Sequence, residues 1–348
     1  MSKTAPWVFG NEKSRHKGIL VETKIPEPWK VTYKKAELDW LVQLRDPQSA
    51  DMDAIPAPEW KQVVKVKLDP ITGELVYLTL GMVGTRYTLC QNEHAFGWFD
   101  KVTFEGAAIV KAAGHRDYGK VVWMIAERPM SFELYPGATV REQLILETSH
   151  NGSTSLSIHF SPHIIETGVP LVVALGKKGV VTEVKIRHTK SMDVKLETIH
   201  HVFDKENIFF QNWRNAILGE QGKPGLKQKI VTEGDVKKVI EKLFPAMSKK
   251  VEKDGQTEEV EEVSGRAEKA RAAILERVQE QVETVKNAHE LAGQPAPTEM
   301  TALDAFLGVS NYVALDKKTR NDGVSWVAAT TGSGQVLRQK AFDLLCGL

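Results

Sequence analysis

Basic and aromatic residues alternate at several places along the middle of the chain, a pattern typical of proteins that bind nucleic acid. Lysine and arginine neutralise phosphates, and aromatic rings stack on bases. The same pattern would arise on a solvated charged face, because a basic stripe specifies no ligand. The candidate DNA-binding residues are Arg86, Tyr87, Arg116, Tyr118, Lys120, Arg128, Lys185, Arg187, His188 and Lys190.

Charge is distributed unevenly along the chain, although the total is nearly balanced. The 348 residues include 46 Lys or Arg and 45 Asp or Glu, which excludes a strongly basic coat protein. Residues 181–250 carry fourteen basic and nine acidic side chains, whereas residues 251–292 carry six and eleven. A basic core followed by an acidic segment could serve a nucleic-acid groove with an acidic flank.

The histidines and cysteines do not form a recognisable metal motif. His159 and His163 are four residues apart, but Pro162 between them excludes the helical face that such spacing needs. His200 and His201 would point in different directions on a helix. With only two cysteines, a disulfide framework and a cysteine-rich zinc site are excluded. We expect no metal site.

The motifs that superficially suggest catalysis are incomplete. The stretch TTGSGQV at 330–336 lacks the Lys-Ser/Thr of a phosphate-binding loop and the third glycine of a dinucleotide fingerprint. The serines of SHNGST lie at a hairpin turn without a nucleophile elbow, and Cys90 follows an apolar strand, as a buried structural thiol does. We therefore expect no catalytic residue and no cofactor.

Alternating apolar and polar residues predict an antiparallel sheet as the core of the protein. Strands are expected at 63–68, 74–80, 107–114, 120–128, 141–149, 153–160 and 179–189. A helix is expected at 92–104 with Asn92 as its cap, and Asn151-Gly152 predicts a tight hairpin turn. The fold class is α+β, with an antiparallel sheet of hairpins and a meander, flanked by helices, and a helical C-terminal part.

Four regions follow from composition. Residues 1–60 form a turn-rich arm, residues 61–247 the α+β core, residues 248–264 an acidic linker, and residues 265–348 a helical segment. In the arm we expect a short helix within 35–44, and we expect the tryptophans to pack rather than stack on bases. Further helices are predicted at 191–218, 233–244, 265–292, from Thr298 onward, and over the last fourteen residues.

The sequence patterns predict no targeting signal and no transmembrane segment. No run approaches eighteen apolar residues, and the first residues carry charges and Trp7 where a signal peptide needs an apolar core. We expect a soluble protein without membrane contact, in the cytoplasm of a bacterial host cell.

Several segments resemble the phage/plasmid-like protein family, a domain of unknown function. They are residues 36–46, 86–102, 112–129, 144–162, 186–191 and 320–345. The most specific parts are Tyr87-x-x-x-Gln91-Asn92 and His150-x-Gly152-Ser153. Residues 163–173 depart from the stretch that the family usually shows there, so an activity carried by that stretch would be altered in this chain.

The order of elements is also similar to the core of single-strand annealing recombination proteins. That resemblance implies a ring or filament of identical subunits that holds single-stranded DNA in a basic groove. It predicts a single-stranded DNA binding and annealing protein of a phage or mobile element, acting in homologous recombination and DNA repair as a homo-oligomer. The alternatives are a non-enzymatic phage structural or host-interaction protein and, less favoured, a nuclease with histidines at its site.

Overall fold

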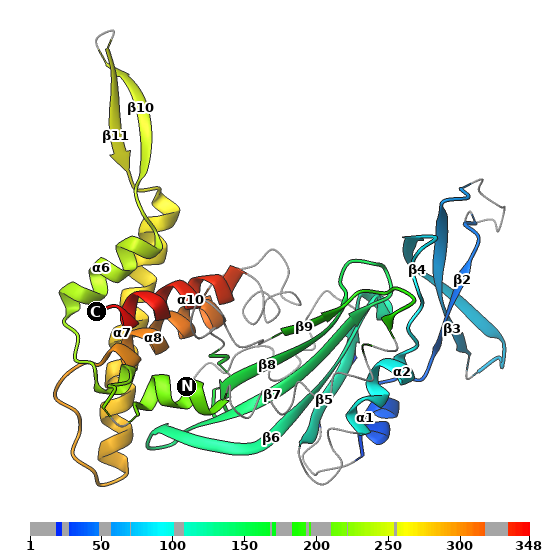
Figure 1. The fold of residues 1–348 in the computed structure, drawn as a ribbon, viewed down its shortest axis with the longest axis horizontal. Coiled ribbons are helices and arrows are strands. Elements are labelled where there is room, and N and C mark those ends of the chain that lie inside the picture. Colours follow the sequence, from blue (N-terminus) through cyan, green and yellow to red (C-terminus); the bar gives the residue numbers. More distant parts are fainter. Residues whose placement is uncertain are drawn as a thin grey trace.

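A computed structural model places an antiparallel sheet at the centre of the molecule, between a smaller sheet and a group of helices (Figure 1). The structure describes residues 19–22, 28–48, 57–69, 71–100, 108–167, 169–171, 183–192, 195, 210–220, 222–253, 256–316 and 333–348. The α+β class, the antiparallel pairing and the helical C-terminal part are confirmed.

The central sheet has six strands in the order β1-β5-β6-β7-β8-β9, and every neighbouring pair is antiparallel. Its strands are β1 (Ile19–Glu22), β5 (Ile109–Arg116), β6 (Val121–Tyr135), β7 (Ala138–Ser149), β8 (Leu156–Ile164) and β9 (Glu183–Ile186). β6 continues well beyond its predicted end at 128, and β7 begins earlier than predicted, because a register shift after Glu127 accommodates Pro129, which cannot donate to the ladder.

The connection between β7 and β8 differs from the predicted two-residue turn. Residues 150–155 separate the two strands, and only Gly152 among them has a positive φ, of 73°. The longer loop is held by Ser149, whose hydroxyl donates to the Thr154 carbonyl and accepts from the Thr154 amide at 2.8 and 2.9 Å. Side-chain bonds therefore close this hairpin where a type I′ turn was expected.

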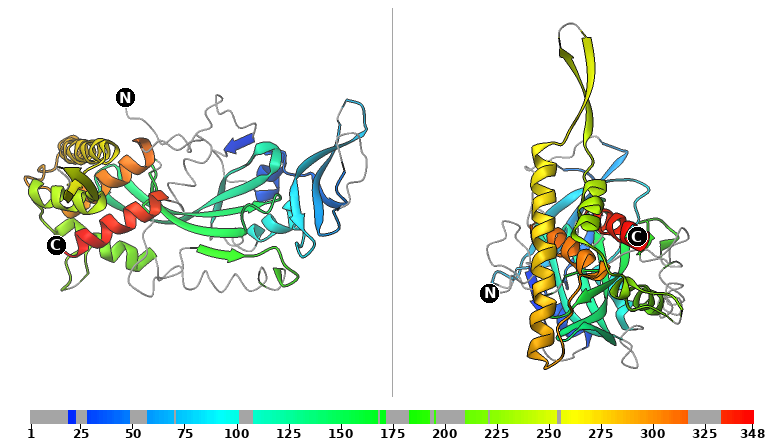
Figure 2. Two further views of the ribbon diagram at one scale, coloured as in Figure 1. Left: turned by 90° about the horizontal axis from the view of Figure 1, so that it is seen from above. Right: turned by 90° about the vertical axis from the view of Figure 1, so that its left-hand side faces the viewer.

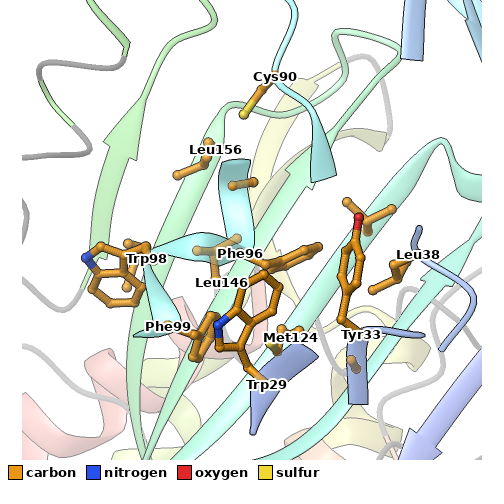
Figure 3. Packing of buried hydrophobic residues seen from close by; sticks show 14 of the residues in the cluster. Trp29, Tyr33, Leu38, Cys90, Phe96, Trp98, Phe99, Met124, Leu146 and Leu156 are labelled. Carbon is orange, nitrogen blue, oxygen red and sulfur yellow. The ribbon is translucent and has the colours of Figure 1, made fainter. Parts of the chain in front are cut away.

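One face of the central sheet is covered by two short helices, α1 (Trp29–Lys35) and α2 (Asn92–Gly97). The aromatic rings of Trp29, Tyr33 and Phe96 pack onto Met124 and Leu146 of the sheet (Figure 3). Trp29 and Trp40 are thus buried, as the packing interpretation predicted. Trp60 is half exposed, and Trp7 lies outside the described residues.

A second sheet, β2-β3-β4, stands at one end of the molecule (Figure 1). It consists of β2 (Leu41–Arg45), β3 (Trp60–Leu68) and β4 (Leu75–Gly84), so the predicted hairpin at 63–80 is confirmed. The helix predicted within 35–44 is wrong. Pairing of Leu41–Arg45 with β3 overrides the helical spacing there, and the positive φ of Glu37 ends α1 before this segment.

The opposite end of the molecule is helical. Its helices are α6 (Glu233–Leu243), α7 (Gly265–Leu291), α8 (Ala302–Asn311) and α10 (Ser333–Cys346), and residues 210–218 are helical as well. They bury a second apolar cluster against the far ends of β6, β7 and β8 (Figure 2). α8 begins after Thr301 and not at Thr298, because Thr301 and Asp304 form a reciprocal capping box.

The predicted linker at 248–264 is wrong, because most of it forms a hairpin. β10 (Met247–Lys253) pairs with β11 (Gln256–Glu262) and projects from the helical end (Figures 1 and 2). The register places Lys250 opposite Glu259. Lysines on one strand and glutamates on the other favour pairing, although each segment alone reads as a polar linker.

The remaining predictions are met in part. Of the helix predicted at 92–104, α2 covers Asn92–Gly97, and Phe99 and Asp100 are again helical after a turn at Trp98; residues 101–107 lie outside the described residues. Of the helix predicted at 191–218, Met192, Lys195 and residues 210–218 are described as helical, and the strand predicted at 179–189 is described from Glu183 and ends at Ile186. Among the described helices, none is long and apolar enough to cross a membrane.

Replacing Gly152 with valine should destabilise the protein by about 1–3 kcal/mol. Its φ of 73° disfavours a β-branched residue, and an added Cβ would already lie 3.4 Å from Val83 Cγ1. Thermal unfolding measures the effect, with Gly84→Val as the matched control, because Gly84 has open space and no positive φ. Equal melting temperatures for the two variants would contradict this description of the turn.

Candidate functional site

Two segments that carry predicted site residues lie side by side at one end of the central sheet. The Thr88 amide donates to the His188 carbonyl at 3.0 Å, and the Tyr87 and His188 rings stack with centroids 4.8 Å apart. The Tyr87 hydroxyl donates to the Ser149 carbonyl at 3.1 Å. The loop after β4 is therefore fixed between the end of β7 and the segment that follows β9.

The turn between β5 and β6 joins the same end of the sheet. The His150 amide donates to the Lys120 carbonyl at 2.8 Å, which ties this turn to the β7–β8 loop. Asp117 and Tyr118 have positive φ values of 50° and 63°, a region that costs energy for residues with side chains. Tyr118 is 48% exposed, so its ring is available to solvent.

The cations around this end of the sheet are mostly exposed. Ile186 is buried between Lys185 and Arg187, so strand alternation leaves both cations on the outer side. Lys120 is half-buried. We call the following set the basic rim: Arg86, Tyr118, Lys120, Lys185, Arg187 and Lys190.

Tyr87 and His188 lie behind the basic rim and not on it. His188 is buried, and its Nε2 lies 3.1 Å from the Thr148 hydroxyl. The imidazole covers one face of the Tyr87 ring, and burial raises the pKa of the Tyr87 hydroxyl. These two side chains position the loop, and the ring faces that they stack against each other are closed to a base.

Arg128 lies away from the rim, in the interior. It is buried, and its guanidinium donates to the equally buried Glu142 at 2.8 Å. The predicted role of Arg128 at a phosphate therefore conflicts with its burial, since moving it outward would leave Glu142 unpaired. Burial raises the pKa of Glu142 to about 7, although the arginine opposes this rise. Arg116 ends β5 opposite Val121, and its side chain lies outside the described part of the chain.

The two most specific family-like motifs meet behind the rim. Asn92 does not cap its helix. Its amide donates to the Leu38 carbonyl at 2.9 Å, and its Oδ1 accepts from His150 Nε2 at 2.7 Å. Both side chains are buried. The sequence placed Asn92 at a helix start, but nothing in the spacing indicated that His150, 58 residues later, is its partner.

Gln91, the residue before Asn92, forms hydrogen bonds with the backbone of β2. Its Oε1 accepts from the Val42 amide at 3.0 Å, and its Nε2 donates to the Val42 carbonyl at 2.8 Å. The side-chain amide thus imitates a further strand beside β2. We call Gln91, Asn92, His150 and the backbone of Leu38 and Val42 the polar joint, because they connect α2, the β7–β8 loop and the second sheet.

Trp40 and Lys65 lie beside the polar joint. Trp40 meets the His150 ring edge-on at 5.3 Å, and the Lys65 ammonium lies 4.4 Å from the Trp40 ring. Burial, followed by the charge of Lys67, lowers the pKa of Lys65 to about 8. Burial, His188 and Lys65 together lower the pKa of His150 to about 3. His150 is therefore neutral at pH 7, and its full burial keeps it from any substrate.

A second charged cluster surrounds Glu127 on the other face of the sheet. Its carboxylate lies 2.6 Å from Arg141, 3.8 Å from Lys111 and 3.7 Å from His163. Burial alone would raise the pKa of Glu127, but the contacts with His163 and Arg141 outweigh it and bring that pKa to about 2. A carboxylate with that pKa is a poor proton donor or acceptor near neutral pH.

Of the histidines considered for a metal site, His159 and His163 lie on β8, and His200 and His201 lie outside the described residues. Residues 156–164 form a strand and not a helix, as Pro162 indicated, but strand alternation still places His159 and His163 on one face. His159 bonds to the Ser157 hydroxyl at 2.9 Å, and His163 contacts Glu127. Within the described residues, no group of three His, Cys, Asp or Glu side chains is arranged to hold a metal ion.

Comparison with family models matches residues 79–331 to the Domain of unknown function (DUF932), and the chain belongs to this family. No curated protein and no solved structure matches the chain. The resemblance to a family of unknown function is therefore confirmed. Within the stretch expected to depart from the family pattern, Ile164, Val169 and Leu171 belong to the second apolar cluster.

Acid should destabilise the protein through His150. Its pKa is about 6.5 in an unfolded chain and about 3 in the folded protein, so unfolding takes up a proton below pH 6.5. The stabilisation is complete above pH 6.5 and is lost progressively as the pH falls towards 3. At pH 5 the loss should be on the order of 2 kcal/mol.

Denaturant unfolding at pH 7 and pH 5 checks this expectation. The variant His150→Gln can still donate to Asn92 Oδ1 but does not titrate, so it should lose less stability on acidification than the native chain. His115 and His188 keep their own lowered pKa values in both proteins. An identical loss in the variant would show that His150 does not titrate as described.

Proposed function

We propose that this protein binds single-stranded DNA on the basic rim and promotes annealing of complementary strands. The observation that carries the proposal is the gathering of four exposed cations and an exposed tyrosine at one end of the central sheet. They come from three separate parts of the chain, joined by the contacts of Thr88 with His188, of Tyr87 with Ser149 and of His150 with Lys120. Backbone neutralisation with some aromatic support is what sequence-independent strand binding requires.

Annealing makes a modest chemical demand on the protein. The bases must stay free to pair, so binding has to rely on phosphates, and no nucleophile or metal is needed. An origin in a phage or other mobile element, a role in recombination and repair in a bacterial cytoplasm, and assembly into a ring or filament belong to the same proposal. They rest on the resemblance to annealing proteins, which is a fold-level analogy.

The triple variant Lys185→Ala, Arg187→Ala, Lys190→Ala should weaken single-strand binding for every sequence. If each cation contacts one phosphate, the slope of log affinity against log salt should flatten by about 2 units. Stability should change little, because exposed charges contribute under about 1 kcal/mol each. Fluorescence anisotropy with a mixed-sequence oligonucleotide at several salt concentrations measures both the affinity and the slope.

The control variant removes the same number of positive charges from the helical end of the molecule. The variant Lys237→Ala, Lys238→Ala, Lys269→Ala also removes three exposed lysines, from α6 and α7. It should keep the native salt slope. If both variants bind alike, the basic rim is only a solvated face, and the non-enzymatic structural or host-interaction alternative gains support.

Tyr118 should contribute by stacking. Tyr118→Ala should cost about 1–3 kcal/mol of single-strand affinity, the usual contribution of one stacked base. Tyr118→Phe keeps the ring and should bind like the native protein. The same anisotropy measurement compares the two. Equal losses in both would point to the hydroxyl and not to stacking, and no loss in either would remove Tyr118 from the site.

The competing functions give different results in the same preparation. Annealing of two complementary labelled strands should be faster with the native protein than with the triple rim variant. Cleavage of the strand on addition of a divalent metal would instead support the nuclease alternative. Electron micrographs with and without single-stranded DNA would test the ring or filament.

A further inference from the structure

The outer half of β4 is an exposed apolar strand at the end of the second sheet. Leu75, Val76, Tyr77 and Leu78 are 55%, 48%, 42% and 40% exposed, so side chains on both faces of the strand meet solvent. The whole of β4, LVYLTLGMVG, carries no charged residue. Edge strands normally carry lysine, proline or a bulge that prevents pairing with another chain. The pairing of β3 with β4 has an irregularity opposite Val63 and Val64, but it lies outside the outer half of β4 and does not protect this part of the edge.

The backbone of this half-strand is arranged to accept a partner. The Asp69 amide donates to the Glu74 carbonyl at 2.8 Å, which sets the alternation of bonded pairs between β3 and β4. In an antiparallel ladder every second residue bonds to the neighbouring strand, and the others turn their N–H and C=O groups outward. Leu75, Tyr77 and Thr79 are therefore the outward residues, and β4 ends the sheet order β2-β3-β4.

Apolar side chains continue from this edge across the sheet. The register places Tyr77 opposite Val66, which in turn lies opposite Leu41, and Leu75 opposite Leu68. Leu41 and Leu68 are 59% and 58% exposed. Arg45 lies over the Tyr77 ring, with its guanidinium 3.9 Å from the ring centroid. An apolar surface of this kind, next to an open edge, is typical of a protein interface.

We propose that two copies of this chain pair along β4, antiparallel, about a two-fold axis at Tyr77. This register sets Tyr77 opposite its counterpart and Leu75 opposite the partner subunit's Thr79, so every outward group meets an outward group. The pairing joins two three-stranded sheets into one of six strands and continues the apolar surface across the axis.

A second copy fits this edge better than a charged peptide would. β4 itself carries no charge that would repel its own copy, and it offers a charged peptide no opposite charge along the strand, although Arg45 of β2 lies over the Tyr77 ring. The other edge strand, β2, is half as long and ends at Arg45, so it is a poorer template for β4. The interface does not depend on the nucleic-acid proposal, because none of the rim residues belongs to β4. A two-fold pair closes on itself, so a ring would need a further surface.

Charge placed at the axis tests the proposal. Sedimentation of the full chain should show a dimer for the native protein. Tyr77→Lys and Tyr77→Glu should each weaken the dimer by more than about tenfold, because like charges then face each other across the axis. An equimolar mixture of the two variants should form the dimer again, since lysine then faces glutamate. Circular dichroism checks that each variant is folded, and Thr79→Lys with Thr79→Glu replaces the pair if Tyr77 variants unfold.

Leu41→Lys is the matched control, because it changes another exposed residue on the same face but at the opposite edge. It should keep the dimer. A monomeric native chain, dimeric single-charge variants, or a mixture that stays monomeric would each overturn the proposal. Loss of the dimer in Leu41→Lys would overturn strand pairing in favour of face-to-face packing of the sheets.

Discussion

The side-chain amide of Asn92 is the contact on which the arrangement of the two sheets depends. It is bonded on one side to the Leu38 carbonyl and on the other to His150, both in the interior. Loss of either partner would leave a buried polar group unsatisfied and would destabilise the protein by about 1–3 kcal/mol. Each hydrogen bond therefore keeps the amide in position for the other. Gln91 extends the same connection to Val42, and the second sheet is thereby attached through polar groups and not only through apolar packing.

The polar joint also explains where the exposed residues lie. His150 is the first residue after β7, and its backbone amide holds the Lys120 carbonyl, so the turn that carries Tyr118 is placed by the same residue. A Cβ on Gly81 would lie 2.7 Å from the Asn151 Cβ, and this close approach fixes the inner half of β4 against the β7–β8 loop. The outer half of β4 extends past this contact and stays open. The motifs most specific to the family resemblance therefore act in architecture, and any binding is left to the less distinctive residues beside them.

Much of the fold could be predicted from the sequence because apolar alternation is a local signal. The central strands, α6 and α7 follow from this periodicity, whereas the cap predicted at Asn92 and the helix start predicted at Thr298 were wrong. The failures share a physical cause, which is that pairing partners distant in sequence decide the outcome. Leu41–Arg45 is a strand only because β3 is beside it, and β10 is a strand only because β11 pairs with it. At the candidate site, the sequence identified the cations but could not show which of them are buried. Arg128 and Lys185 look alike in sequence, but Arg128 is buried against Glu142 and Lys185 is exposed.

The basic rim and the β4 edge are connected by the chain itself, which gives their combination a definite geometry. Arg86 follows Tyr77 by nine residues, the first seven of them within β4. At about 3.3 Å per residue, Arg86 would lie at most roughly 30 Å from the two-fold axis, so two rims would be at most roughly 60 Å apart. Because paired β4 strands run in opposite directions, the rims would lie at opposite ends of the shared sheet. A DNA strand long enough to reach both would bind the second rim as an intramolecular step, at a high effective concentration. Shorter strands would gain nothing from dimerisation, because they could occupy only one rim at a time.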